Sequence, residues 1–380
     1  MNHINASLLF KIKKTIRYWQ LYGISRTLAK VRGQYHMKRR FGVLPAQSAG
    51  HGRGKVGLIG CGNFAFSNIA YYLHKNYGSI IKSAMDVDIN RAASLFHQYH
   101  LSNYTDDAYS ILKDPDIEYV YIASNHASHA EYAIEALNHN KHVHIEKPHA
   151  VSEDQLQRLC AAASKSDKVI TLGFNRPGSF LGLKIKEALD SQPGAVMLNW
   201  FLAGHEISPD HWYFEKEEGG RILGNLCHWT DFVYQMVPEK ARYPIRIIPT
   251  RANTSDCDIA VNYVFGDGSI AAITFSAKGH TFEGVRERFS AHKGNVLISM
   301  DDFQTLTIEN NADKKIIRQR HRDHGHERAI TKCIRLGPLN NRDNSANVRY
   351  LFESGELFLK TRQALEENRE LSALGWQGPI

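Results

Sequence analysis

The alternation of strand-like and helix-like segments between Lys55 and Asn175 constrains the fold more than any other feature of the sequence. The strand-like segments are short and almost continuously apolar, and helix-like patterns separate them; the strands are "KVGLIGCG", Ile80–Asp86, "IEYVYIAS", "HVHIEK" and "VITLGFN". Strands of this kind, each followed by a helix, are typical of a parallel sheet that is covered on both faces. The sequence therefore predicts an α/β domain over residues 55–174.

The rhythm changes after Asn175, where the strands become longer and alternate between apolar and polar residues. Turn residues separate them, and Gly266-Asp267-Gly268 is a hairpin signal. We expect residues 175–380 to form an α+β domain with a mainly antiparallel sheet, which ends in a helix from about Asn347 to Leu371.

The first 54 residues have a different character and are predicted to form a basic arm and a linker. Residues 1–50 contain ten Lys or Arg and no Asp or Glu, and "PAQSAGHGRG" (Pro45 to Gly54) is small, polar and glycine-rich. Ile12, Ile16 and Trp19 recur at helical spacing with lysines and an arginine between them. Three alternatives stay open for the arm: it packs on the body or on a neighbouring subunit, lies on an anionic membrane surface, or acts as a targeting presequence.

Composition excludes several classes of protein. No apolar run approaches the roughly 20 residues of a membrane-spanning helix, and the N-terminus lacks the pattern of a secretion signal. The five cysteines are scattered without a C-x-x-C pair, which fits a reducing cytoplasm rather than a disulfide framework. The chain carries a net charge of +8, and without its first 50 residues the net charge falls to −2, so the body is not expected to bind nucleic acid.

A glycine motif follows the first strand of the α/β domain. Gly60 and Gly62 with Ala65 form G-x-G-x-x-A, and Asn63 and Phe64 occupy the turn between them. Such a turn lets a pyrophosphate approach the backbone at the start of the following helix. Asp86 ends the next strand, where its carboxylate can accept hydrogen bonds from the ribose hydroxyls and repel a 2′-phosphate. The motif therefore predicts a dinucleotide site that prefers NAD to NADP.

Polar side chains also end the fourth and fifth strands of this sheet, where ligands of parallel sheets bind. Ser124 and Asn125 end the fourth strand, and Glu146 and Lys147 end the fifth. A partly buried ammonium at Lys147 could donate to a substrate hydroxyl and stabilise an alkoxide that develops as hydride leaves carbon. We expect Glu146 to point towards the cofactor or a backbone amide.

A second group of polar residues lies on a predicted helix within Glu217–Met236. Asn225, His228 and Asp231 fall at i, i+3 and i+6 and form one polar stripe among apolar residues. A carboxylate beside an imidazole can hold it in the tautomer that a proton acceptor needs, so we expect Asp231 to orient His228.

Taken together, "GLIGCGNFA", Asp86, "HVHIEKP", "GFNR" and the segment ending "CHWTD" resemble the Gfo/Idh/MocA oxidoreductases, the family of glucose-fructose oxidoreductase and inositol dehydrogenase. The resemblance spans about Lys55 to the C-terminus. It implies a Rossmann domain, an open and mainly antiparallel sheet domain often used for oligomerisation, and a final helix that returns towards the first domain. It also implies oxidation or reduction of one carbinol carbon of a sugar or cyclitol, with Lys147 and His228 in catalytic positions and His129 at the cofactor.

Two departures from the family's pattern bear on the substrate. Many relatives have an aspartate four residues before the catalytic histidine, where this chain has Gly224, and they commonly have a Thr-Pro pair within the segment that reads "ASNHASH" here. The nearest polar substitute is Asn225, which cannot act as a base. The other candidate substrate contacts are Asn175, Arg176 and Trp212.

The expected function is therefore that of a cytoplasmic, homo-oligomeric NAD-dependent oxidoreductase acting on a sugar-like, nucleotide-linked or cyclitol substrate. The cluster "HRDHGHE" (His321 to Glu327) is interpreted as a polar loop, so no metal site is expected. Two alternatives are a cofactor-binding regulator or scaffold without turnover and a peripheral membrane component of glycan assembly.

Overall fold

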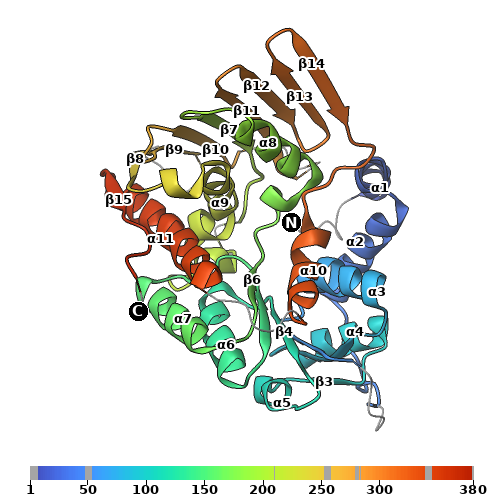
Figure 1. The fold of residues 1–380 in the computed structure, drawn as a ribbon. Helices are drawn as coiled ribbons and strands as arrows, with labels where there is room; N and C mark the ends of the chain where they lie inside the picture. The colour runs from blue at the N-terminus through green and yellow to red at the C-terminus, as the bar shows by residue number, and fades with distance from the viewer. Residues whose placement is uncertain are drawn as a thin grey trace.

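A computed structural model describes residues 7–47, 54–208, 210–251, 258–278, 282, 284–338 and 345–378. Two sheets, one at each end of the molecule, are joined and flanked by helices (Figure 1). Most of the expected linker, residues 48–53, lies outside the described part of the chain.

The first sheet has six parallel strands in the order β3-β2-β1-β4-β5-β6. Its strands are β1 (Val56–Ile59), β2 (Ile81–Met85), β3 (Asn103–Thr105), β4 (Tyr119–Ile122), β5 (His142–Ile145) and β6 (Ile170–Leu172). This order is that of a dinucleotide-binding Rossmann sheet, which confirms the predicted architecture. All four residues of β1, β4 and β5 are buried, which explains the apolar sequences of β1 and β4, and in β5 the histidines His142 and His144 are buried as well.

Helices cover both faces of this sheet (Figure 1). They are the π-helical segment η1 (Ala65–Ala70), α3 (Tyr71–Tyr77), α4 (Ile89–Tyr99), α5 (Ala108–Leu112), α6 (His126–Asn138) and α7 (Glu153–Lys165). From the second half of the chain, α10 (His326–Leu336) also packs on this domain, where the Tyr121 hydroxyl donates to the Ile330 carbonyl (2.7 Å).

The second sheet has nine strands in the order β14-β13-β12-β11-β7-β10-β9-β8-β15, antiparallel except for the parallel pair β7 and β10. They are β7 (Met197–Ala203), β8 (Ile245–Arg251), β9 (Asp258–Val264), β10 (Ile270–Ser276), β11 (Arg286–Lys293), β12 (Val296–Asp301), β13 (Thr305–Asn310), β14 (Asp313–Arg318) and β15 (Leu371–Ala373). Burial alternates along β7, β9, β10, β11 and β12, so one face builds the core and the other faces outwards.

The helices between the two sheets position the site. Five segments lie here: η2 (Arg176–Gly178), α8 (Phe180–Asp190), η3 (Trp212–Phe214), the π-helical η4 (Ile222–Leu226) and α9 (Cys227–Met236). Trp229 and Phe232 of α9 are buried, and Phe232 packs against Trp200 of β7.

The final helix, α11 (Ser345–Glu367), packs against α7 of the first domain, so the chain does return there as expected. The expected end at Leu371 is wrong. Asn368 adopts a left-handed conformation (φ 48°) that stops the helix, and Leu371 begins β15, which pairs with β8.

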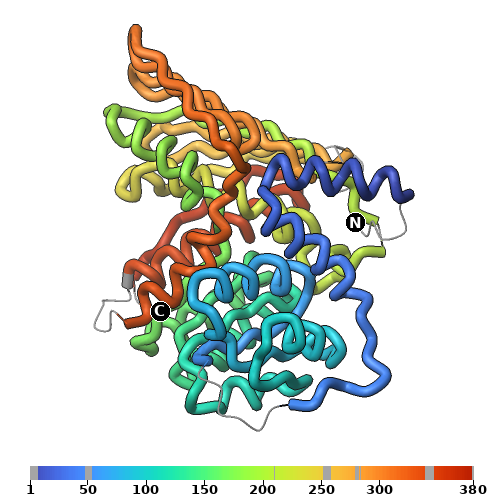
Figure 2. Tube along the Cα trace, turned by 90° about the vertical axis from the view of Figure 1, so that its right-hand side faces the viewer, coloured from blue at the N-terminus to red at the C-terminus, as the bar shows by residue number. Residues whose placement is uncertain are grey.

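The N-terminal arm forms two helices, α1 (Leu8–Tyr22) and α2 (Ile24–His36), which lie beside the body between the two sheets (Figure 2). At the corner between them, the Arg322 amide donates to the Leu21 carbonyl (2.7 Å). On the other side, the Arg26 guanidinium of α2 bonds to Asn68 of η1 (2.6 Å). The arm therefore packs on the body, one of the three expected alternatives, and contacts both domains.

Candidate active site

The glycine turn lies at the carboxyl end of β1. Gly60 has a φ of +89°, and a Cβ there would come within 2.5 Å of the Ala123 carbonyl carbon, so only glycine fits. A Cβ at Gly62 would meet nothing within 4 Å, which leaves the space that a pyrophosphate needs above the turn. Ala65 is buried where η1 meets the sheet. These observations fit a dinucleotide at this turn.

Asp86 is buried at the end of β2 and faces the same turn. Its Oδ2 accepts from the Cys61 amide (2.7 Å) and its Oδ1 from the Asp88 amide (2.9 Å). Arg91 lies nearby, with its Nη1 4.0 Å from Oδ1. The carboxylate is thus fixed beside the glycine turn, where the remaining lone pairs of its oxygens can accept from ribose hydroxyls.

The arm reaches the glycine turn, which the sequence did not predict. The His36 Nε2–H donates to the Cys61 carbonyl (2.7 Å), and its ring stacks on Phe66 of η1. The Lys30 ammonium lies 3.4 Å from Oδ1 of Asn63, and burial, followed by the charge of Arg26, lowers the pKa of Lys30 to about 8. The only signal was the helical periodicity of the arm, which does not say where a helix docks.

Of the other expected cofactor residues, Asn63 and Phe64 are used within the protein. Asn63 accepts through its backbone carbonyl from the Ser67 hydroxyl (2.7 Å) as well as meeting Lys30. The Phe64 ring packs against His326 of α10 (5.7 Å between ring centroids). The carboxylate of Glu146 lies against Gly173 and 3.4 Å from Nε2 of His144, and no backbone amide of the described residues donates to it, so the expected backbone partner is not found there.

Hydrogen bonds connect the end of β4 to the loop that precedes η4 and α9. The Glu218 carboxylate accepts from the Asn125 amide group (2.6 Å) and from the backbone amide of His126 (2.7 Å). This places a negative charge at the start of α6, where the helix dipole stabilises it. The hydroxyl groups of Ser124 and Ser128 form a hydrogen bond (2.7 Å). The ring nitrogens of His129 contact two backbone carbonyls, Nδ1 that of Pro148 (2.8 Å) and Nε2 that of Ser124 (3.1 Å).

Lys147 lies at the end of β5, and its side chain reaches η4, the segment that leads into α9. Its Nζ donates to the Gly224 carbonyl (2.7 Å) in η4. Burial lowers the pKa of Lys147, but Tyr213, Cys227 and Glu146 act against burial, and the pKa lies above the usual lysine value. The amine therefore stays charged at neutral pH and can act as a hydrogen-bond donor rather than as a base.

Gly224 leaves room for two aromatic rings. A Cβ at this position would lie 2.7 Å from Cε2 of Tyr213 and 2.8 Å from Cε1 of His126. The rings of Tyr213 and His126 also face each other, with centroids 4.7 Å apart. The volume that an aspartate side chain would need is therefore filled by these rings, which explains the departure from the family's pattern.

His126 is a site residue that the sequence did not single out. Burial, followed by the charge of Lys147, lowers the pKa of His126 to about 2, so the ring is neutral beside the ammonium. Its Nδ1 contacts the Glu218 carbonyl (2.9 Å). Because Glu218 lies 92 residues away along the chain, no local pattern could have indicated this contact.

His228 follows Gly224 by one helical turn and lies in the same group. Burial, followed by the charges of Arg176 and Lys147, lowers the pKa of His228 well below its usual value. Its Nδ1 is buried and has no hydrogen-bond partner among the described residues. The imidazole is therefore in the neutral form that a proton acceptor needs, but burial and the neighbouring positive charges mean that it would hold an accepted proton only weakly.

The expected role of Asp231 in orienting His228 does not match the geometry. The Asp231 carboxylate accepts from the Tyr350 hydroxyl (2.6 Å) and from the Gln235 amide (2.8 Å) instead. Helical spacing put Asp231 near the histidine, but α11 packs against this side of α9 and supplies Tyr350. Burial raises the pKa of Asp231 to about 7.

Asn175 and Arg176, expected at the substrate, are engaged elsewhere. The buried guanidinium of Arg176 makes two hydrogen bonds to Glu287 (2.7 and 2.8 Å), and Glu287 also accepts from the Trp229 indole (2.8 Å). The Asn175 amide donates to the His324 carbonyl (2.7 Å). We therefore interpret both residues as structural residues next to α9, because their polar groups already have protein partners.

The two remaining substrate candidates are better placed. Oδ1 of Asn225 is buried and has no hydrogen-bond partner among the described residues. The Trp212 ring is 37% exposed and packs against His126 (4.7 Å between centroids). The Trp212 ring can therefore contact a small molecule held near Lys147, whereas the Asn225 oxygen is covered by protein and would reach one only after neighbouring side chains move.

Among the described residues, those of the histidine-rich loop included, no three or more His, Cys, Asp or Glu side chains are grouped so that they could hold a metal ion. Desolvation lowers the pKa of His324 and that of His326 well below the usual value. Nor does any helix in the described part of the chain have the length and apolarity to cross a bilayer.

Comparison with known proteins agrees with this geometry. Residues 54–174 match the family model described as "Oxidoreductase family, NAD-binding Rossmann fold", named for Gfo, Idh and MocA. An inositol 2-dehydrogenase of Salmonella typhimurium is 29% identical over 185 residues, which are 43% of this chain and 55% of the relative. An oxidoreductase of Formosa agariphila is 31% identical over 36% of this chain and 42% of its own length.

Longer but weaker matches extend beyond the Rossmann domain. A myo-inositol 2-dehydrogenase of Thermotoga maritima is 26% identical over 260 residues, 67% of this chain and 77% of that protein. A levoglucosan dehydrogenase solved with NADH and levoglucosan superposes with a TM-score of 0.71 over 83% of this chain and 98% of that structure, at 17% identity. At that identity the superposition shows the two-domain fold alone. Residues 54–174, one of the two domains, thus match an NAD-binding Rossmann domain of the Gfo/Idh/MocA oxidoreductases.

Proposed function

We propose that this oxidoreductase transfers a hydride between nicotinamide and a secondary alcohol or ketone of a sugar-like, nucleotide-linked or cyclitol substrate. The observation that carries the proposal is the meeting of Lys147 with the catalytic helix, where its ammonium bonds to Gly224 one turn before the neutral His228. The names of the inositol and levoglucosan dehydrogenases support the substrate class.

The dinucleotide would be held by the glycine turn and by Asp86. Gly60 and Gly62 leave room for the pyrophosphate, and the fixed Asp86 carboxylate would accept from the ribose hydroxyls, which favours NAD over NADP. When bound, the nicotinamide ring supplies the redox chemistry by accepting or donating the hydride.

The protein's own residues would handle the substrate oxygen and its proton. The Lys147 ammonium would donate to the carbinol oxygen and stabilise the negative charge that develops on it. The neutral imidazole of His228 would accept the proton during oxidation and return it during reduction. Asn225 and Trp212 would contact other parts of the ring.

The test is an absorbance assay for reduced nicotinamide with the full chain and a panel of cyclitols, free sugars, anhydrosugars and nucleotide-linked sugars. His228→Ala should lower kcat/KM by at least about a hundredfold while NADH affinity, measured by fluorescence titration, stays unchanged. His97→Ala, at an exposed histidine on α4, is the matched control. Equal turnover in the His228 variant would reject its role, and NADH binding without turnover of any panel member would favour the non-catalytic regulator.

The proposed oligomer would use the outer face of the nine-stranded sheet. That face exposes apolar side chains on four strands: Met197, Phe201, Ile270, Leu297 and Ile316. Light scattering on Phe201→Glu should give a smaller particle than the wild type. An unchanged mass would mean that the face is not the contact.

A further inference from the structure

The two arm helices each expose an apolar stripe that the body does not cover. On α1 the stripe consists of Leu8, Leu9, Ile12, Ile16 and Trp19, all between 46% and 73% exposed. At 3.6 residues per turn these five side chains fall within an arc of about 100°. The opposite side of α1 carries Leu21, which is buried against the body. The helix therefore has one apolar face for the body and a second one that faces outwards.

The second helix repeats this arrangement. Ile24, Leu28, Val31 and Tyr35 recur at i, i+4, i+7 and i+11, and all are at least 36% exposed. The opposite face of α2 holds the body through Arg26, Lys30 and His36. An isolated exposed leucine needs no explanation, but two continuous stripes on adjacent helices mark an interaction surface.

The charges around the stripes indicate the kind of partner. On α1, Lys11 and Lys13 flank the stripe on its two sides, and the arm carries ten Lys or Arg without an acidic residue among residues 1–50. Two copies of such an arm would repel each other, and nucleic acid would leave the apolar stripes in water. An anionic lipid surface satisfies both features, because headgroups attract the lysines and the interfacial region takes up Leu, Ile and Trp side chains.

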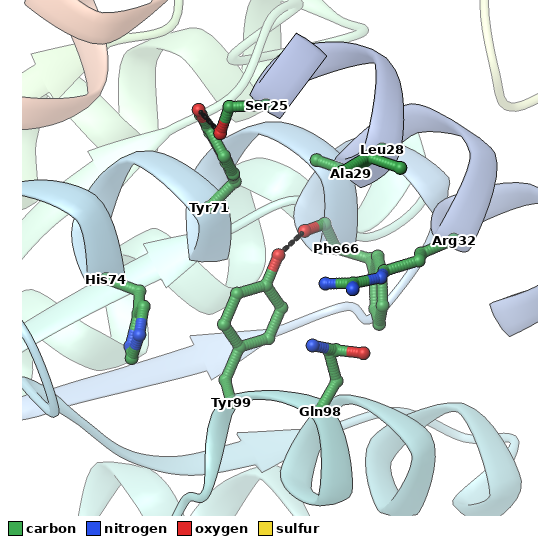
Figure 3. Close-up of a pocket in the computed structure, with 9 residues that line it drawn as sticks. All are labelled: Ser25, Leu28, Ala29, Arg32, Phe66, Tyr71, His74, Gln98 and Tyr99. Atoms are coloured by element: carbon green, nitrogen blue, oxygen red, sulfur yellow. Dashed lines mark hydrogen bonds between the residues drawn. The ribbon is translucent and has the colours of Figure 1, made fainter.

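A recess beside the α2 stripe supports this choice. Leu28 of the stripe also lines a cavity of about 230 Å³ between α2, α3 and α4 (Figure 3). The Arg32 side chain extends from α2 into this cavity towards Gln98 and Tyr99 (Figure 3). None of the described residues that line the cavity is acidic, so an anionic headgroup would meet the guanidinium there without competition from them.

We propose that the exposed faces of α1 and α2 dock the enzyme on an anionic membrane surface. The contact is peripheral, since the stripes face outwards from helices whose other sides hold the body. It places the glycine turn next to the docked surface, because His36 and Lys30 of α2 contact Cys61 and Asn63.

The experiment is sedimentation of the full chain with vesicles of phosphatidylcholine, with and without phosphatidylglycerol. The chain should sediment with the mixed vesicles only, and high salt should release it. Ile12→Glu with Ile16→Glu should lower the partition coefficient by at least about tenfold, while NADH binding stays unchanged as evidence of folding. Tyr109→Glu with Leu374→Glu, at exposed apolar positions on the body, is the matched control and should bind as the wild type does.

Charge variants test the second half of the proposal. Removing one Lys or Arg near an anionic surface weakens binding about fivefold, so Lys11→Gln with Lys13→Gln should lose roughly twenty-five-fold and Arg32→Gln about fivefold. Lys216→Gln with Lys240→Gln, exposed on the body, serves as the control. Equal binding to both kinds of vesicle, or to neither, would overturn the proposal. So would a halved particle mass in the Ile12/Ile16 variant without any vesicle binding, which would identify the face as a contact between copies.

Discussion

The two ends of the proposed site are held in different ways. At the dinucleotide end, Asp86 bonds to Cys61, which lies 25 residues away in the glycine turn after the neighbouring strand β1. At the catalytic end, Lys147 bonds to Gly224 across 77 residues, and Asn125 bonds to Glu218 across 93. The first end is a property of one sheet, whereas the second forms only when the two domains pack. Changes at the dinucleotide end should therefore have local effects, and changes at the catalytic end should combine loss of chemistry with loss of domain packing.

The largest effect is expected at Lys147. Lys147→Met should lower turnover by about three to five orders of magnitude, because charge stabilisation and positioning of the substrate oxygen are lost together. NADH affinity should change by no more than a few-fold, since the glycine turn is untouched. Steady-state kinetics and fluorescence titration measure the two quantities, with the exposed Lys165→Met as the control. A parallel loss of NADH affinity would show that the two ends are not independent.

The next largest effect is expected at Asp231, a buried carboxyl group on α9. Burial raises the pKa of Asp231 to about 7 from 3.8, so the folded state keeps a proton that the unfolded state has already released. The contribution of Asp231 to the free energy of unfolding is fully present below about pH 4. It is lost as the pH rises to about 7, and the loss amounts to about 4 kcal/mol. Relative to the wild type, Asp231→Asn should therefore gain stability as the pH rises over this range. Urea titrations at several pH values measure it, and parallel curves for the two proteins would refute the assignment.

A smaller effect is expected at Gly224. Its added methyl group in Gly224→Ala would overlap the rings of Tyr213 and His126, which should cost about 1–3 kcal/mol of stability and lower turnover. Combining it with Tyr213→Ala should recover part of the stability but not the turnover. The comparison of thermal unfolding midpoints with kcat for the single and double variants separates packing from chemistry. No recovery of stability would mean that Tyr213 is not the obstructing group.

The smallest effect is expected at the dinucleotide end. Asp86→Ala should narrow the preference for NAD over NADP by about tenfold, or about 1.4 kcal/mol, because the charge that repels a 2′-phosphate is gone. Ratios of kcat/KM for the two cofactors measure it, and the exposed Asp106→Ala controls for a change of charge alone. An unchanged ratio would place Asp86 away from the ribose.

The same difference between the two ends of the site decides which parts of it could be predicted from the sequence. The six-stranded sheet, the glycine turn and the position of Asp86 follow from spacing within a short stretch of chain. By contrast, Asp231 lies at helical spacing from His228, yet Tyr350, 119 residues further on, takes up its carboxylate. Likewise Arg176 pairs with Glu287 across 111 residues. Such partners depend on how α11 and β11 pack, and a periodic pattern carries no information about them.

Gly224 is another position at which the site differs from the pattern that the resemblance implies. Gly224 removes the carboxylate that many relatives would have, but the structure fills that volume with Tyr213 and His126. A hydroxyl and a neutral imidazole beside Lys147 give the pocket a different polarity from one that contains a carboxylate. A substrate with its own anionic group would therefore meet less repulsion here than in those relatives.

The arm, finally, is attached to both domains. Its corner holds Arg322 of the second domain, while its other end holds Cys61 of the first. Any opening motion that separates the domains must break one of these attachments, so retention of the arm and closure around a nucleotide share one equilibrium. If a nucleotide binds the closed arrangement of the two domains, a change that strengthens the attachments of the arm must strengthen nucleotide binding by the same free energy, and a bound nucleotide must strengthen those attachments in turn.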